Sequence, residues 1–150
     1  MRYLLDVNAL LALVMTSHQH HPRTLQWMTQ HQSEGWATCA FTQAALVRIA
    51  SQNHPSGGGP VRTVFTPRLA AEVLRQNIAN KHHRFVSLDF GYDQVLATCT
   101  GGIVGHRQVT DAWLVTLAAR KGIKLVTFDS GIDALLATPA ERQTHLLTLS

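Results

Sequence analysis

Short apolar segments that lead into, or follow from, helix-like segments run through this sequence. Near the N-terminus, Tyr3–Leu5 is typical of a buried strand, and residues 7–15 are apolar on every side except Asn8, as in a buried helix. Near the C-terminus, a helix predicted over residues 110–121 leads into a β-branched and aromatic strand over 124–128. Strands that alternate with helices predict an α/β fold with a mostly parallel sheet covered on both faces.

Other segments carry the start and stop signals of further elements. We expect a flexible loop over residues 55–60, which contain three consecutive glycines, a short strand at 85–86, and an edge strand over 146–149. The same criteria predict a helix with Pro22 at its first position, Leu25 and Met28 inside and Gly35 as its stop, followed by a strand over 36–39. They also predict a helix from a Thr42 cap through Leu46, Ile49, Ala50 and Asn53. A further helix is expected from Thr66-Pro67, with Leu69, Val73, Leu74 and Ile78 inside, and Gly122 is expected to end the late helix.

Length and composition predict one globular domain over residues 1–150. Hydrophobic residues make up 45% of the chain and charged residues 15%, which suits a packed core and not a disordered chain. No apolar run reaches the roughly 20 residues of a membrane-spanning helix, and no signal peptide is recognisable. The two cysteines, Cys39 and Cys99, lack metal-site spacing and do not establish a disulfide framework. We therefore expect a cytoplasmic protein.

The charge balance is basic. Thirteen Lys and Arg residues face nine Asp and Glu residues, for a net charge of +4 and a pI near 9.6. If three aspartates are occupied at a metal site, only six acidic residues balance those bases, and such a surface attracts polyphosphate chains. Ordinary solubility charge explains the same numbers equally well.

Three aspartates occupy positions from which they could meet. Asp6 and Asp129 each follow a predicted strand, and ligands of parallel sheets bind at the carboxyl ends of the strands. Asp111 lies in the first turn of a helix that we expect to start at the same edge. Carboxylates placed close together repel one another and need a cation, and oxygen ligands favour Mg²⁺ or Mn²⁺. A divalent ion held there could position a water for attack on a phosphodiester.

Each aspartate also has a purely structural explanation. Asp111 could cap its helix or complement the helix dipole. Asp129, which precedes Ser130-Gly131, could be a turn residue. Asp6 is harder to explain in this way, because a carboxylate between an apolar strand and an apolar helix is unfavourable unless it is paired or bound to a metal.

Three motifs, in the same order along the chain, resemble those of PIN-domain ribonucleases, especially the VapC toxins of toxin–antitoxin modules. They are Leu4-Leu5-Asp6-Val7-Asn8-Ala9-Leu10-Leu11, Val109-Thr110-Asp111-Ala112-Trp113-Leu114 and Leu125-Val126-Thr127-Phe128-Asp129. The resemblance implies an α/β/α sandwich with a central parallel sheet and a Mg²⁺-dependent endoribonuclease. It also implies a small antitoxin partner and a homodimer. By position, Asp6, Asp111 and Asp129 match the family's metal-site acids, and Asn8 and Thr127 match residues that support the site.

One position departs from the family pattern. The family generally has a Glu where this chain has Gln43, and a Gln side chain supplies neither a negative charge nor a base. This predicts weaker metal binding. Asp93 and Asp133 are the candidates to compensate for it, although no motif supports either. The second hypothesis is a catalytically weakened RNA- or antitoxin-binding module.

Two arginines are candidates for contact with RNA phosphates or antitoxin carboxylates. We place Arg48 and Arg107 nearest the acidic edge, where a guanidinium can bind either group through two hydrogen bonds. An ordinary surface pairing is the alternative for both. The three tryptophans, Trp27, Trp36 and Trp113, are better explained as core or interface residues than as a base-stacking surface.

Overall fold

The computed structural model describes residues 1–52 and 65–150, so the predicted glycine-rich loop over 55–60 and the predicted helical position Asn53 lie outside the described residues. It contains a five-stranded sheet in which all neighbouring strands pair in parallel, in the order β3-β2-β1-β4-β5. The strands are β1 (Tyr3–Leu5), β2 (Trp36–Thr38), β3 (His83–Phe85), β4 (Lys124–Thr127) and β5 (Leu146–Thr148).

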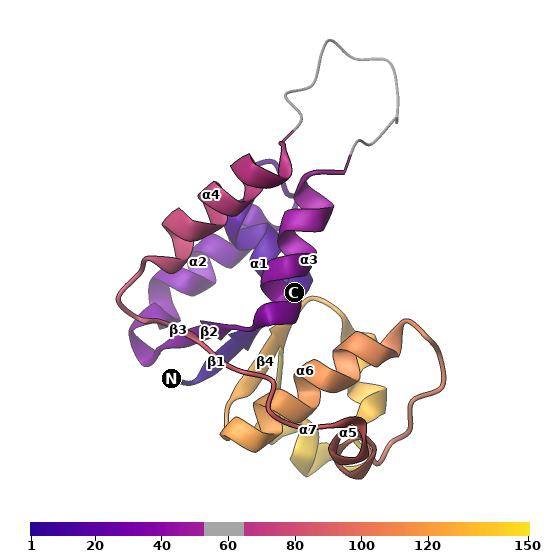
Figure 1. The fold of residues 1–150 in the computed structure, drawn as a ribbon. Coiled ribbons are helices and arrows are strands. Elements are labelled where there is room, and N and C mark those ends of the chain that lie inside the picture. Colours follow the sequence, from indigo (N-terminus) through magenta and orange to yellow (C-terminus); the bar gives the residue numbers. More distant parts are fainter. Residues whose placement is uncertain (53–64) are drawn as a thin grey trace.

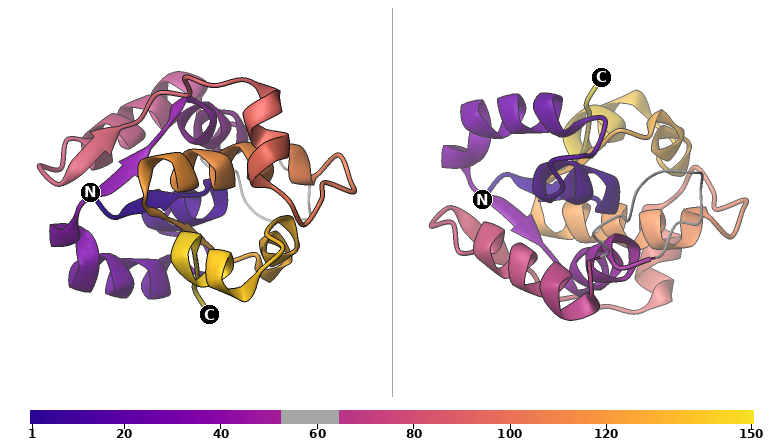
Figure 2. Two further views of the ribbon diagram at one scale, coloured as in Figure 1. Left: turned by 90° about the horizontal axis from the view of Figure 1, so that it is seen from below. Right: turned by 90° about the horizontal axis from the view of Figure 1, so that it is seen from above.

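Helices cover both faces of this sheet (Figure 1). In the views from below and above, α6 lies in front of the sheet on one side and α1 on the other (Figure 2). One layer holds α1 (Val7–Val14), α2 (His21–His31), α3 (Ala40–Ala50) and α4 (Pro67–Ile78); the other holds α5 (Tyr92–Thr98), α6 (Gln108–Lys121) and α7 (Pro139–His145); short 3₁₀ turns are η1 (Gln32–Glu34) and η2 (Ser130–Leu135). The predicted three-layer α/β/α sandwich with a parallel sheet is confirmed.

Two hydrophobic cores form because strand residues alternate between the faces of the sheet. Leu4 and Leu125 pack with α6, whereas Tyr3, Leu5 and Val126 pack with α1 and its neighbours. Trp27 and Trp36 are buried in the second core, as predicted, and Trp113 is half-buried beside the first. Because both faces are covered, polar groups that approach the sheet must do so at its edges or strand ends.

Several predicted boundaries are wrong for local reasons. The helix expected to start at a Thr42 cap starts at Ala40, because the Thr42 hydroxyl accepts a hydrogen bond from the Cys39 N–H, at 3.0 Å, inside the first turn. The helix expected to start at Thr110-Asp111 starts at Gln108. The α-helical part of α2 ends at His31, and a 3₁₀ turn fills the space before Gly35.

Two residues predicted to face the core are exposed. Leu25 is 48% exposed, and Trp27 takes its place beside Met28 on the inner face of α2; Leu69 is 42% exposed, and Ala70 is buried instead. The Thr66 cap of α4 and the left-handed Gly122 at the end of α6 (φ +63°) are as predicted. None of the helices in the described ranges 1–52 and 65–150 has both the length and the apolar character needed to span a bilayer.

Candidate metal and nucleotide site

Asp6 connects β1 to α1 and is almost fully buried, at 4% exposure. It is the N-cap of α1, and its Oδ1 accepts a hydrogen bond from the Ala9 N–H at 2.6 Å. Burial, together with the smaller effects of the nearby charges of Asp111 and Asp129, raises the pKa of Asp6 to about 6, against hydrogen bonds from Thr127 and Ala9 that lower it. Asp6 is therefore a buried carboxyl group whose ionisation is disfavoured by two neighbouring carboxylates.

Thr127, the last residue of β4, links Asp6 to Asp129. Its buried hydroxyl accepts a hydrogen bond from the Asp129 N–H at 2.9 Å and hydrogen-bonds the Asp6 carboxylate. Asp129 is exposed and caps η2, because its Oδ1 accepts a hydrogen bond from the Gly131 N–H at 2.7 Å. The turn role that the sequence suggested for Asp129 is confirmed, and it leaves the second carboxylate oxygen available.

Asp111 is the fourth residue of α6 and is half-buried. Burial raises its pKa, and the charge of Asp129 raises it further. The N-cap position of α6 is Arg107, which makes no side-chain capping hydrogen bond, so Asp111 is not the cap of its helix. Its place in the first turn still suits the helix dipole.

The three predicted acids therefore affect one another electrostatically at the carboxyl end of the sheet. The charges of Asp111 and Asp129 both raise the pKa of Asp6, and the charge of Asp129 raises the pKa of Asp111. Within residues 1–52 and 65–150, no three His, Cys, Asp or Glu side chains lie close enough together to hold a metal ion as they stand. Carboxylates without a cation between them repel. The donor set nevertheless fits a hard divalent ion in its chemistry, since all of its ligand atoms are oxygens.

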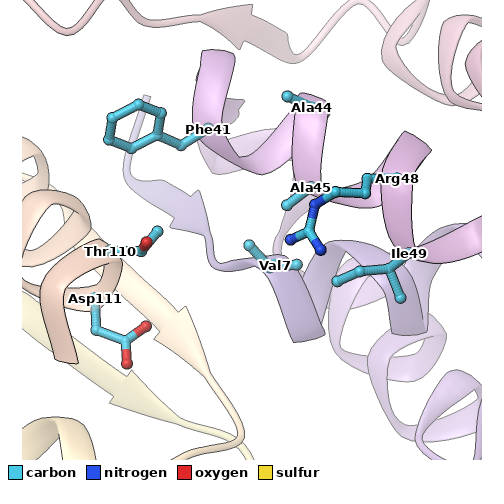
Figure 3. Close-up of a pocket in the computed structure, with 8 residues that line it drawn as sticks. All are labelled: Val7, Phe41, Ala44, Ala45, Arg48, Ile49, Thr110 and Asp111. Carbon is cyan, nitrogen blue, oxygen red and sulfur yellow. The ribbon is translucent and has the colours of Figure 1, made fainter. Parts of the chain in front are cut away.

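A cavity of about 460 Å³ lies beside these acids (Figure 3). Thr110 and Asp111 of α6 line one side, and residues of α3 face them. Val7, the residue after Asp6, also lines the cavity. The α3 residues recur at positions i, i+3, i+4, i+7 and i+8, which places them on one side of the helix; they are Phe41, Ala44, Ala45, Arg48 and Ile49.

Gln43 lies on another side of α3. Its Nε2 donates a hydrogen bond to Thr38 Oγ1 at 2.8 Å, and this hydroxyl also pairs with His83 Nε2 at 2.8 Å. Gln43 lines the groove between α3 and α4 and is not among the residues that line the cavity beside Asp111. Its amide thus has a structural partner.

The remaining predicted residues occupy different positions. Arg48 lines the cavity, as expected of a residue near the acidic edge, and Arg107 is exposed directly before α6. Asn8 is exposed in the first turn of α1. Among the acids in the described part of the chain, those that raise the pKa of Asp6 or Asp111 do not include Asp93 or Asp133.

Sequence reasoning missed Phe41, Val7 and Thr110 as residues around the acids. Val7 and Thr110 are neighbours of Asp6 and Asp111 and could have been found from that adjacency alone. Phe41 was detectable from its spacing, because it lies seven residues before Arg48 and so on the same side of a helix.

The sequence matches the PIN domain family over residues 3–135. It is 42% identical to a protein named Ribonuclease VapC38 from Mycobacterium tuberculosis, over 97% of this chain and 98% of that protein. It is 37% identical to Ribonuclease VapC44 from the same species, over 99% and 100% of the two chains. The fold is similar to a crystal structure of VapBC2 from Rickettsia felis bound to a promoter DNA fragment (TM-score 0.66, 13% identity, 100% of each chain) and to FitAB bound to a DNA fragment (TM-score 0.63, 16% identity, 97% of this chain and 94% of that one).

Proposed function

This chain belongs to the PIN domain family, and from that premise we propose that it is a VapC-type endoribonuclease whose reaction depends on a divalent cation held by Asp6, Asp111 and Asp129. The observation that carries the proposal is the mutual effect of these acids: the charges of Asp111 and Asp129 both raise the pKa of the buried Asp6. Such repulsion is unfavourable in the free protein and is relieved when a cation binds.

The protein's own residues have separable roles in this scheme. Thr127 and the N-terminus of α1 orient the Asp6 carboxylate through hydrogen bonds. Arg48 binds RNA phosphate from the opposite side of the cavity. A bound Mg²⁺ or Mn²⁺ would lower the pKa of a water and stabilise the charge that develops on the phosphodiester. Asn8 and Arg107, both exposed near these elements, are proposed as a supporting residue and a second phosphate contact.

A binding module that has lost catalysis is the second candidate, because Gln43 replaces a family Glu. Two observations make it less favoured. The relatives that match nearly the whole chain are named ribonucleases. Gln43 donates a hydrogen bond to Thr38 and lines the α3–α4 groove. Because its side chain does not line the cavity beside Asp111, a Gln at this position does not take a carboxylate away from that cavity.

We also propose an antitoxin partner, in line with the toxin–antitoxin family that the chain resembles. The two structural neighbours are VapBC2 bound to a promoter DNA fragment and FitAB bound to a DNA fragment. A homodimer and a cytoplasmic location complete the proposal. Light scattering on the purified chain, alone and with a small protein encoded directly upstream, tests the two assemblies.

RNA cleavage tests the catalytic proposal. The purified chain should cut a folded RNA with Mg²⁺ or Mn²⁺ and not with EDTA, and Asp6→Asn should lower the rate at least 100-fold, because the mutation removes an anionic ligand. Asp93→Asn makes the same chemical change at an exposed position in the first turn of α5 and should leave the rate unchanged. Equal cleavage by wild type and Asp6→Asn would refute the assignment.

A further inference from the structure

We propose that the cavity beside Asp111 binds one unpaired nucleotide of the RNA, with its base against the Phe41 ring and the adjacent phosphate at Arg48. The proposal rests on the ribonuclease function proposed above and names the feature of the RNA that the site recognises. It predicts that bases, and not only phosphates, contribute to binding.

Phe41 presents an aromatic surface to the cavity. The side chain is 38% exposed, although phenylalanine is usually buried, and its ring extends from α3 toward the opposite wall that carries Thr110 (Figure 3). Trp113 holds it from behind in a near-perpendicular contact, with ring centroids 5.8 Å apart and an interplanar angle of 80°. Trp113 is itself stacked on Phe90 at 5.1 Å. The Phe41 ring is thus fixed by an aromatic cluster while part of its surface remains open to a ligand.

Arg48 provides a positive charge on the same side of α3. It lies seven positions after Phe41, which corresponds to about 10 Å along a helix. Its guanidinium points into the cavity (Figure 3), and within residues 1–52 and 65–150 it makes no salt bridge. Asp111 lies on the opposite wall, and without a bound cation its carboxylate repels a phosphate placed near it. The phosphate of a bound nucleotide is therefore directed to the Arg48 end.

The remaining walls fit a flat ligand. Val7, Ala44 and Ala45 are small and apolar, and the Thr110 hydroxyl can form a hydrogen bond with a base edge. The volume of about 460 Å³ lies within the usual range for small-ligand sites. A base inside a duplex cannot reach such a wall, whereas bases in single-stranded loops stack on aromatic side chains. The occupant is therefore an unpaired nucleotide.

The test compares two fluorescein-labelled oligonucleotides with the same number of phosphates: octauridylate and an octamer without bases. Binding is measured by anisotropy in EDTA, where no cleavage occurs. Phe41→Leu should weaken octauridylate binding roughly 5- to 150-fold, which is the range for loss of one stacked base, and should change binding of the abasic octamer less than twofold. Phe41→Tyr should retain octauridylate binding, because it keeps the aromatic ring. Arg48→Gln should weaken both oligonucleotides alike.

Phe85→Leu is the matched control, because Phe85 is 55% exposed and lies outside this cavity; it should change neither affinity. Urea unfolding of each variant identifies any that fails to fold. If Phe41→Leu weakens both oligonucleotides equally, or neither, the nucleotide site is refuted. The second of these results is also the one expected if the cavity receives a side chain of a protein partner.

The cleavage assay separates failure of this site from failure of the proposed function. Cleavage that depends on Asp6, together with binding that does not depend on the bases, would refute the nucleotide site alone. Base-dependent binding at Phe41 without any cleavage would refute the ribonuclease and leave the nucleotide site intact.

Discussion

The Asp6 side chain stabilises the fold through one hydrogen bond and destabilises it through its buried charge. Its Oδ1 caps α1 through the Ala9 N–H, a contact that typically contributes about 1 kcal/mol. Its negative charge is nevertheless buried and faces the charges of Asp111 and Asp129, which together with burial place its pKa near 6 instead of 3.8. A carboxyl group whose pKa rises on folding destabilises the folded state whenever it is ionised.

Asp6→Asn should therefore stabilise the metal-free protein at neutral pH. The amide keeps an oxygen for the cap and carries no charge, so the free energy of unfolding in EDTA at pH 7.5 should rise by up to about 3 kcal/mol, since one pKa unit is worth about 1.4 kcal/mol. The unfavourable contribution is fully present above pH 6 and disappears as pH falls from 6 to below 3.8. The advantage of the variant should shrink over the same window.

Urea titrations at pH 7.5 and pH 4 measure this effect, with Asp93→Asn as the control of equal chemistry at an exposed site. Addition of Mn²⁺ at pH 7.5 should then stabilise the wild type and not Asp6→Asn. A metal-free variant that is less stable than wild type at pH 7.5 would show that the capping contact outweighs the buried charge.

At the level of the helix, α3 divides its surface among three neighbours. Thr42 and Leu46 face the buried interior, Phe41, Ala45 and Arg48 line the cavity, and Gln43 lies toward α4. A shift of the helix by one residue would move each side chain by about 100° around the axis. The capping interaction between Cys39 and Thr42 fixes the start of the helix and so decides which residues face the acids.

A second fixed contact joins the loop after α5 to η2, the turn that follows Asp129. The Gly101 N–H donates a hydrogen bond to the Leu135 carbonyl at 3.0 Å, and a Cβ at this position would overlap the Ala134 carbonyl oxygen. Gly101→Ala should therefore destabilise the protein by about 1–3 kcal/mol, as overpacking against backbone does.

Gly105→Ala is its control, because a Cβ there meets no atom within 4 Å; we expect a change of less than about 1 kcal/mol. The mid-transition temperature and the urea midpoint of both variants give the comparison. Similar stability of the two would mean that η2 moves aside easily.

At the scale of the whole molecule, the carboxyl ends and the amino ends of the parallel strands lie at opposite edges of the sheet. Asp6 and Asp129 follow adjacent strands, β1 and β4, at the carboxyl edge, whereas Arg2 precedes β1 at the other edge and pairs with Glu34. A net charge of +4 attracts RNA in general, but the basic residues near the carboxyl edge determine where the RNA binds.

The salt dependence of octauridylate binding tests this arrangement. Single-stranded nucleic acid releases about 0.7 counterion for each phosphate contact, so Arg48→Gln should reduce the slope of log K against log salt by about 0.7. Arg2→Gln removes the same charge at the opposite edge and should leave the slope unchanged. Equal slopes for all three proteins would place the phosphate contact elsewhere.

The class of fold and the identity of the three aspartates could be predicted from the amino-acid sequence. Strand alternation and the caps at Thr66 and Gly122 are local signals, and they were sufficient because each depends on neighbours along the chain. Which side chains face the core, the cavity or solvent could not be predicted from the sequence. Packing of the whole core sets the rotation of each helix and the contacts between elements that are distant in the sequence. These determine the exposure of Leu25, the hydrogen bond from Gln43 to Thr38 and the position of Phe41 in the cavity that Asp111 also lines.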